Sequence, residues 1–372
     1  MQTYRLCKKC AERQGAESVP FEIVQGRGCF VCQGMMDTTG KVAEVAARRA
    51  TRYQFRTFAV GVTVPEGVQE REDELRSELK LKGKETIKIQ AARLVTAQVS
   101  HTLRKRVDRQ RPDLTLLADF GVGDVSVSSR PVFYYGKYTK PAGVSQHRSF
   151  CEQCRGAGCK KCHNTGFNRK PSVEGALRVK LADFSGSQKM TFTWLGSEDR
   201  ESRVYPPGRP FVAEVKNPRK RSFPRKFGTR VGGGLVSVSS GRALPSKPVH
   251  VPAFRFITRI RATAASKVSA EGLAELKSRF MRAAVRFDRP HNRPTVKTVY
   301  RASAKAKGRT LIIEAELDGG LPVKRFVSGE LVSPSVSEVL KTEVGCRSFD
   351  ICGVREIGGF GFAEITRGEE KN

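Results

Sequence analysis

Eight of the ten cysteines stand in four Cys-x-x-Cys pairs, which are Cys7/Cys10, Cys29/Cys32, Cys151/Cys154 and Cys159/Cys162. Two such pairs joined by a linker are typical of a structural zinc site, in which four thiolates surround one tetrahedral ion. We therefore expect about two zinc ions per chain, and no metal catalysis, because an all-cysteine site leaves no open coordination position. A cross-paired arrangement stays open, as does a redox dithiol in the second set. The other two cysteines, Cys346 and Cys352, are expected to be buried core thiols.

A second group of side chains that could bind a ligand lies in the basic segment 216–234, KNPRKRSFPRKFGTRVGGG. Its cations could bind phosphates, and Phe223 and Phe227 between them could stack on unpaired bases. A solvated surface loop is the ordinary alternative. A phosphate-cradling glycine loop is disfavoured, because no lysine and hydroxyl residue follow the Gly232–Gly234 run. We expect RNA contact from seven cations, Lys216, Arg219, Lys220, Arg221, Arg225, Lys226 and Arg230.

Three carboxylates, those of Glu198, Asp199 and Glu201, lie where an expected strand runs into a loop within strongly basic surroundings. Such a carboxylate is either a salt-bridge partner or a nucleophile that neighbouring cations keep ionised. Spacing alone favours the structural role. No Ser/His/Asp or Cys/His signature competes with these residues, and no GxGxxG that follows a strand indicates a methyltransferase.

The charge balance favours a polyanionic partner. The 372 residues carry a formal net charge of +31 at pH 7, from 68 Lys and Arg against 37 Asp and Glu. Such an excess concentrates nucleic acid, because neutralised phosphates release counterions. An anionic membrane is the competing partner, but no apolar run approaches the roughly 20 residues of a transmembrane helix. The N-terminus does not resemble a signal peptide, so we expect a cytoplasmic protein whose clustered cysteines bind metal.

The elements that must position these groups begin with residues 1–36, which are short, rich in glycine and dependent on the first zinc set for stability. Residues 40–110 are predicted to be largely helical, and segment 111–138 to form short strands. Together they predict an α/β domain that closes near residue 145. The helical prediction depends on an apolar stripe at helical spacing, formed by Ile87, Ala91, Leu94, Val95, Val99 and Leu103.

After the second cysteine set, the pattern changes to strands. Segments 189–196 and 254–262 alternate apolar and polar side chains, and 310–326 predicts two strands around an Asp-Gly-Gly turn. A helix is predicted over about 266–287. This combination predicts a mixed α+β domain built on an antiparallel sheet.

Six anchors occur in order along nearly the whole chain, and together they resemble one family: the archaeal and eukaryotic tRNA pseudouridine synthases with an N-terminal zinc and THUMP-containing region (the Pus-ten family). The anchors are the two knuckles within residues 7–32, RPD…SSRPVFYYGKYTK (111–140), CEQCRGAGCKKCHNTG (151–166), GSED…GRPFVAEVKNP (196–218), Tyr300 in KTVYRAS, and VKRFVSGELVSPSVSEVL (323–340). Residues 151–162 also resemble chaperone zinc modules, but the helical J-domain of those chaperones is missing from the sequence.

The resemblance implies a role for each catalytic residue. The catalytic aspartate of the family's Gly-Arg-Glu-Asp motif falls on Asp199, and the tyrosine that stacks on the target base falls on Tyr300. Val323 and Lys324 match the aliphatic and basic residues that pack the active site and ion-pair with the aspartate. Isomerising uridine means breaking N1–C1′, turning the base and joining C5 to C1′ without a cofactor. An ionised carboxylate can attack C1′ or take the C2′ proton, once the target is flipped out of its stack.

One departure from the family pattern concerns base flipping. Ser197 stands where the family usually has the arginine that displaces and replaces the flipped base. Arg200 or Arg203 is therefore expected to take this role. These two arginines and Arg209 complete the expected RNA-binding set.

We therefore expect an α+β protein with a zinc-bearing, THUMP-like module that binds tRNA over residues 1–168, and a pseudouridine synthase domain over residues 169–372. By resemblance, its substrate is uridine in the TΨC arm of tRNA, at positions 54 and/or 55, with no organic cofactor and no small-molecule cosubstrate. Two alternatives are a catalytically weak RNA-binding or RNA-chaperone protein that retains the fold, and a THUMP-linked enzyme of another chemistry such as thiolation. The missing nucleotide-binding loop argues against the second alternative.

Overall fold

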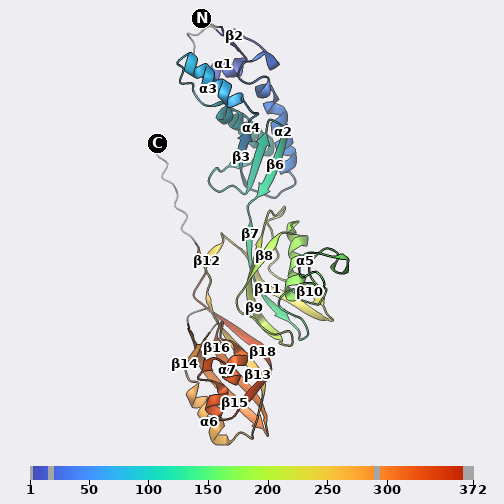
Figure 1. Ribbon diagram of the computed structural model, residues 1–372, viewed down its shortest axis with the longest axis vertical. Helices are drawn as coiled ribbons and strands as arrows, with labels where there is room; N and C mark the ends of the chain where they lie inside the picture. Colours follow the sequence, from blue (N-terminus) through green and yellow to red (C-terminus); the bar gives the residue numbers. More distant parts are fainter. Residues whose placement is uncertain (1–2, 16–20, 289–293, 363–372) are drawn as a thin grey trace. The chain divides into compact units, whose positions relative to one another are not determined.

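The computed structural model describes residues 3–15, 21–288 and 294–362. The chain divides into two compact units (Figure 1). The first unit is Met1–Pro131 with Lys216–Arg221, and the second is Val132–Val215 with Ser222–Asn372. Each unit has its own apolar core, and both mix helices with sheet, so the predicted α+β class is confirmed. No helix among the described residues is long and apolar enough to span a bilayer.

The first unit combines a cysteine-bearing cap with a four-stranded sheet of order β4-β3-β5-β6. The cap contains β1 (Arg5–Leu6), α1 (Lys8–Gln14), β2 (Glu22–Ile23), η1 (Gly26–Gly28) and η2 (Met35–Thr38). The sheet and its helices are α2 (Thr39–Ala50), β3 (Thr57–Thr63), α3 (Val68–Glu78), α4 (Ile87–Leu103), β4 (Arg106–Val107), β5 (Leu114–Asp119) and β6 (Asp124–Ser129). The predicted apolar stripe lies on α4, where Ile87, Ala91, Val95 and Val99 are fully buried.

The segment 216–221 belongs to the first unit because its backbone and side chains bond there. The Gln54 amide N–H donates to the Arg219 carbonyl (2.7 Å), and the Ser129 N–H donates to the Asn217 side chain (2.7 Å). The Arg221 guanidinium donates to the Arg130 carbonyl (2.6 Å). The first third of the basic segment is therefore held in place by the sheet of this unit.

The second unit is built on one sheet of eleven strands, of order β10-β11-β7-β9-β18-β13-β16-β15-β14-β17, with β8 pairing β9. Its strands are β7 (Val132–Lys140), β8 (Met190–Trp194), β9 (Val204–Val215), β10 (Phe227–Val231), β11 (Gly234–Leu244), β13 (Ala253–Ala264), β14 (Ala283–Phe287), β15 (Thr295–Lys307), β16 (Thr310–Asp318), β17 (Val332–Ser333) and β18 (Val344–Ile357). All of these pairings are antiparallel except a single parallel contact of β9 with β18.

Four helices accompany this sheet. They are α5 (Val173–Ser185), α6 (Ala270–Arg279), α7 (Val323–Ser328) and α8 (Val336–Leu340), and the short turn η3 (Lys160–Cys162) precedes them. A separate two-stranded pair is formed by β12 (Pro248–His250) and β19 (Gly361–Phe362). Strand β13 alternates as predicted: Phe254, Phe256 and Ile260 are buried in the core, whereas Arg259 and Arg261 are exposed.

Three boundaries differ from the sequence expectations. Strand β7 pairs with β11 and β9, so the second unit begins at Val132 and not after residue 168. The predicted helix over 266–287 ends at Arg279, and Arg282 then takes a left-handed φ of 53° that breaks the helix before β14. The segment after the Asp-Gly-Gly turn is the helix α7 and not a second strand.

Candidate active site and metal centres

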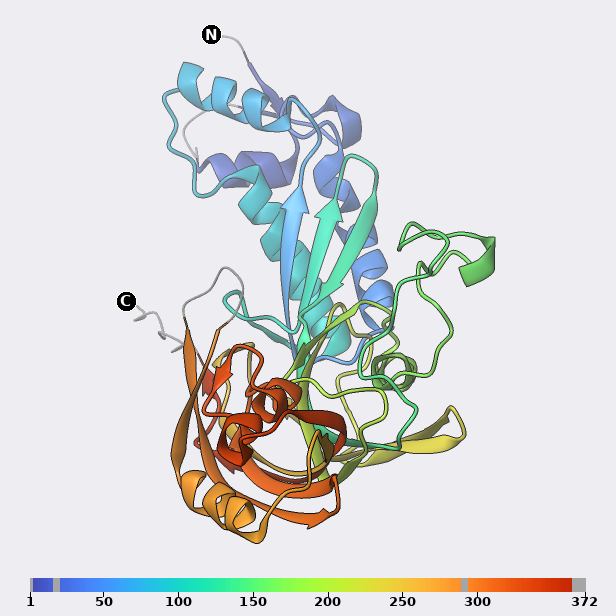
Figure 2. The same cartoon turned by 60° about the horizontal axis from the view of Figure 1, so that its bottom comes forward.

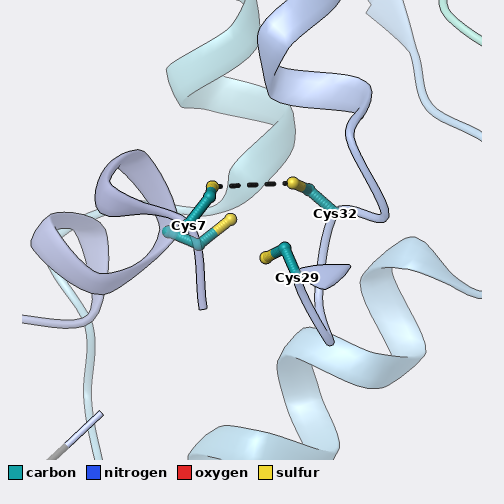
Figure 3. A group of neighbouring side chains, drawn as sticks. Cys7, Cys29 and Cys32 are labelled. Atoms are coloured by element: carbon teal, nitrogen blue, oxygen red, sulfur yellow. Dashed lines mark hydrogen bonds between the residues drawn. The ribbon is translucent and has the colours of Figure 1, made fainter. Parts of the chain in front are cut away.

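The first four-cysteine set comes together around α1 and η1 of the cap. The sulfurs of Cys7, Cys10, Cys29 and Cys32 lie within 4.8 Å of one another, and all four residues are buried. Figure 3 shows Cys7, Cys29 and Cys32 converging on one point, with the Cys7 and Cys32 sulfurs 3.7 Å apart. Four sulfurs around a tetrahedral zinc ion stand roughly 3.8 Å apart, because each Zn–S bond is about 2.3 Å long. The set therefore fits a zinc ion.

A buried arginine supports this set from outside. The Arg13 guanidinium donates to the Cys10 sulfur (3.4 Å) and to the Glu72 carboxylate (2.6 Å). A donor of this kind stabilises thiolate charge and orients the ligand. Glu72 in turn accepts from the N–H of Ile87 at the start of α4 (2.8 Å). The cap is thereby tied to the helix that covers the sheet.

The second set lies between β7 and α5, and its four sulfurs also lie within 4.8 Å of one another. The pairs Cys151/Cys159, Cys154/Cys162 and Cys159/Cys162 have sulfurs 3.9, 3.7 and 3.7 Å apart. The Gly166 N–H donates to the Cys162 sulfur (3.3 Å). Each set is complete within itself, so one ion per set fits the structure and cross-pairing does not.

The remaining cysteines, Cys346 and Cys352, belong to neither set and are half-buried. The expectation of buried core thiols holds only in part. Cys346 packs against the core of the second unit, and burial raises the pKa of its thiol to about 11.

A cavity of about 490 Å³ in the second unit brings together Asp199, Val323 and Lys324. The Lys324 ammonium lies 2.9 Å from the Asp199 carboxylate. This hydrogen bond raises the pKa of Lys324 above its usual range, so the ammonium keeps its charge at neutral pH. Helix α7 presents the Val323 and Lys324 side chains, because Pro322 ends the extended segment before it. A carboxylate in such a cavity, whose walls are both polar and apolar, can act as nucleophile or base.

The loop that carries Asp199 is fixed on one side by a buried charge pair. Glu198 accepts a hydrogen bond from the Tyr138 hydroxyl (2.7 Å) and ion-pairs with Arg209 (3.1 Å), and both charged side chains are almost fully buried. The Arg209 guanidinium also lies over the Phe256 ring, 4.7 Å from its centre. The expected RNA contact of Arg209 is therefore corrected: this arginine belongs to the core of the second unit.

A buried lysine fixes the other side of the loop. Lys140 is 3% exposed, and its ammonium donates to the carbonyls of Val144 (2.8 Å), Asp199 (3.0 Å), Arg200 (3.2 Å) and Ser202. Burial lowers the pKa of this ammonium. Three carbonyls of the chain segment 199–202 thus point at one cation, which sets the direction of the loop backbone beside Asp199.

Tyr300 is not among the residues that line the Asp199 cavity. Its hydroxyl donates to Asp318 (3.0 Å), and the Arg255 guanidinium covers its ring at 3.6 Å. Arg255 alternates along β13 with the core residues Phe254 and Phe256, so the Arg255 side chain lies on the face of the sheet opposite to theirs. Tyr300 does not line the Asp199 cavity, whose aromatic walls are Phe287 and Phe349.

Sequence reasoning missed Phe287, Lys140 and the Glu198–Arg209 pair. No motif distinguishes Phe287 from the other apolar residues of β14. The one available signal for Lys140 was a lysine at the end of a strand otherwise rich in aromatic residues, VFYYGKYTK.

The predicted cations have different surroundings. Arg200 and Arg203 are exposed and follow Asp199 in the sequence, and the Arg200 side chain donates to the Gly143 carbonyl (3.1 Å). Lys216, Arg219, Lys220, Arg225, Lys226 and Arg230 are also exposed. Arg221 is half-buried and bonded. The rings expected to stack on bases are instead half-buried against the core: Phe223 and Phe227 lie 5.4 and 6.4 Å from the Tyr134 ring.

Two family models match the chain, "Pus10 THUMP domain, archaeal" over residues 42–119 and "Pus10, C-terminal" over residues 133–355. The match to the second begins one residue after the start of the second unit. Two curated relatives carry the name tRNA pseudouridine synthase Pus10. The relative from Cenarchaeum symbiosum (strain A) is 31% identical over 98% of this chain and 90% of its own. The relative from Methanopyrus kandleri is 31% identical over 89% and 81%.

Among solved structures, an H/ACA RNP bound to a substrate RNA containing 2′-deoxyuridine overlaps 58% of this chain and 46% of its own. Its TM-score is 0.32 at 7% identity. This overlap is too small to add to the argument.

The geometry of the two cysteine sets predicts that each set binds one zinc ion independently of the other. We expect the wild-type chain to hold about two zinc ions, and Cys29→Ser and Cys154→Ser each to lose about one, because three thiolates hold the ion far more weakly than four. Plasma emission spectrometry of the purified chains measures this. Cys352→Ser is the control and should keep both ions. Loss of both ions in either single variant, or fewer than one in the wild type, would contradict two independent sites.

Proposed function

Because the chain belongs to the Pus10 family, we propose that it is a tRNA pseudouridine synthase that isomerises uridine in the TΨC arm, at position 54, at position 55 or at both. The observation that carries this proposal is the Asp199–Lys324 ion pair at 2.9 Å on the wall of an open cavity. The isomerisation conserves every atom of the base and sugar, so it needs a positioned carboxylate and a pocket for the detached base, and no cosubstrate.

In this proposal Asp199 performs the chemistry. Its carboxylate either attacks C1′ or removes the C2′ proton, and the N1–C1′ bond breaks in both cases. The detached base turns and C5 bonds to C1′. In the first case the bond from Asp199 to C1′ breaks in this step, and in the second case Asp199 returns the proton to C2′. The C5 proton is then lost and N1 gains one. Lys324 holds the carboxylate in place before the reaction through the ion pair at 2.9 Å.

The cavity walls supply the space in which the base turns. Val323 and Phe287 are apolar, and neither competes for the hydrogen bonds of the uracil edge. We assign Phe287 the aromatic wall that the resemblance placed on Tyr300, since Phe287 lines the Asp199 cavity. A base must leave its helical stack to enter such a pocket. Arg200 and Arg203 are exposed and close to Asp199 in sequence. We assign to one of them the role of filling the position that the flipped base leaves in the RNA stack.

The first unit and the exposed cations would bind the rest of the tRNA. Shape and phosphates dominate recognition of folded RNA, which suits a chain with a net charge of +31. The cysteine sets would each hold one structural zinc ion and take no part in the reaction. A purely RNA-binding protein would not need a carboxylate and an ammonium facing each other in a cavity, so the catalytic reading is favoured over the RNA-chaperone alternative.

We expect Asp199→Asn to lower kcat by about 10⁴-fold or more, because the amide is neither a nucleophile nor a base. Pseudouridine is mapped by carbodiimide treatment and primer extension on an unmodified tRNA transcript. Transcripts with cytidine at 54 or at 55 distinguish the target positions. The variant should still bind tRNA, which shows that the chain is intact. No product from the wild type would contradict the enzyme assignment, and product from the variant would contradict the role of Asp199.

We expect Lys140→Met to lower kcat by about 10²-fold, because the catalytic loop loses the cation that orients its carbonyls and a displacement of about 1 Å has that cost. The Kd for tRNA should stay within about twofold, since Lys140 is buried away from RNA. Single-turnover kinetics and anisotropy binding measure the two quantities. Lys180→Met on the surface of α5 is the matched control. Equal activity of Lys140→Met and wild type would refute the positioning role.

A further inference from the structure

Residues 148–170, which we call the knuckle module, form a compact loop between β7 and α5 that carries the second cysteine set (Figure 2). Its two ends pair like a short antiparallel ribbon. The Cys151 N–H donates to the Gly166 carbonyl (2.9 Å), and the Asn168 N–H donates to the Ser149 carbonyl (2.9 Å). The loop is therefore closed by backbone bonds at its base and by four sulfurs at its centre.

An exposed aromatic stack stands at the base of the knuckle module. Phe150 is 62% exposed, and its ring stacks on Phe167 with centres 5.2 Å apart and planes 22° apart. The Arg148 guanidinium lies over Phe167 at 3.4 Å. Gly156 takes a φ of 107°, and a Cβ there would lie 3.1 Å from the Phe150 ring, so the backbone of the module packs directly against this side chain.

The surface around the stack is strongly basic. Five cations of the module are exposed, and Glu152 is the single acidic residue among residues 148–170. Within the described residues, Lys170 is the one cation of this module that ion-pairs with a carboxylate, that of Glu152 at 3.1 Å. The five are Arg155, Lys160, Lys161, Arg169 and Lys170.

An isolated exposed phenylalanine is ordinary on a protein surface. Here three further properties coincide with it: a stacked partner ring, a guanidinium that covers that ring, and five exposed cations against one carboxylate, that of Glu152. This is the combination that binds unpaired nucleotides, because every base has a face to stack on and every nucleotide brings a phosphate.

We propose that the knuckle module is an RNA-binding surface, on which Phe150 stacks on an unpaired base of the tRNA substrate and the exposed lysines and arginines bind the neighbouring phosphates. This inference rests on the proposed function for the identity of the RNA. It assigns the second zinc set a task of its own, which is to hold a recognition surface rigid. The aromatic and basic combination that the sequence suggested at 216–234 is realised here, because Phe223 and Phe227 are packed against Tyr134.

The test measures binding of the full-length, zinc-loaded chain to an unmodified tRNA transcript by fluorescence anisotropy. Phe150→Ala and Phe150→Leu should each raise the Kd about tenfold, since stacking of one base is lost. Leucine keeps an apolar side chain but offers no ring, and Phe150→Trp should bind as wild type does. Met281→Ala removes another side chain of the second unit that is 61% exposed, and it should bind normally.

The charge half of the proposal is tested by the salt dependence of the same Kd. Lys160→Glu with Lys161→Glu should lower the slope of log Kd against log salt by about 1.4, from roughly 0.7 for each lost phosphate contact. Lys305→Glu with Lys307→Glu, which reverses two other exposed lysines of this unit, is the control. Equal losses in both double variants would attribute the effect to overall charge and overturn the proposal.

Zinc content and circular dichroism show whether each variant is folded. Normal binding by a folded, zinc-loaded Phe150→Leu chain would overturn the stacking role, whatever Phe150→Ala does. Pseudouridine formation by the wild type is measured separately. If tRNA binding depends on Phe150 but the wild type forms no pseudouridine, the proposed function fails and the RNA surface stands. If pseudouridine forms but Phe150 does not affect binding, the reverse holds.

Discussion

The structure of the candidate active site depends on buried charges beneath one loop. Glu198 and Arg209 form an ion pair with side chains 0% and 4% exposed, and Lys140 is buried under the carbonyls of residues 199–202. Burying such groups costs several kcal/mol per ion, and replacing a buried pair by apolar residues is often neutral or stabilising. A contribution to stability alone therefore does not explain the presence of these buried charges. Their geometric effect is specific: they hold the backbone on both sides of Asp199, whose carboxylate lies 2.9 Å from the Lys324 ammonium.

This constraint also explains where the second unit begins. Tyr138 and Lys140, which bond Glu198 and the carbonyls of the catalytic loop, both lie on β7, and Arg209 lies on the neighbouring strand β9. A chain cut after residue 168 would separate the catalytic loop from two of its supports. The knuckle module is consequently an insertion inside the second unit, between its first strand and its first helix, and not the end of the first unit.

Features that depend on residue spacing and periodicity could be predicted from the sequence. The role of a residue could not be predicted where it depends on which distant side chains surround it in the fold. The four Cys-x-x-Cys pairs and the alternation of β13 are local patterns, so both sets and the sheet could be expected. Asp199, Val323 and Lys324 required the resemblance, because 124 positions separate the aspartate from Val323. A buried arginine such as Arg209 has the same sequence signal as an exposed one. Tyr300 is not among the residues that line the Asp199 cavity, and it lies at a β-bulge between Val299 and Arg301, which no single sequence reveals.

The two cysteine sets use the same chemistry in opposite environments. All four residues of the first set are buried within the core of the first unit, where the ion would add to packing that already exists. The knuckle module has no comparable core: Cys154 and Cys159 are partly exposed, and Phe150, one of its two phenylalanines, faces solvent. A segment this short cannot order itself by hydrophobic burial, so a bound ion would add to the rigidity that its backbone hydrogen bonds give. A rigid exposed ring loses little entropy on binding, which is the physical reason to place a metal under a surface rather than inside a core.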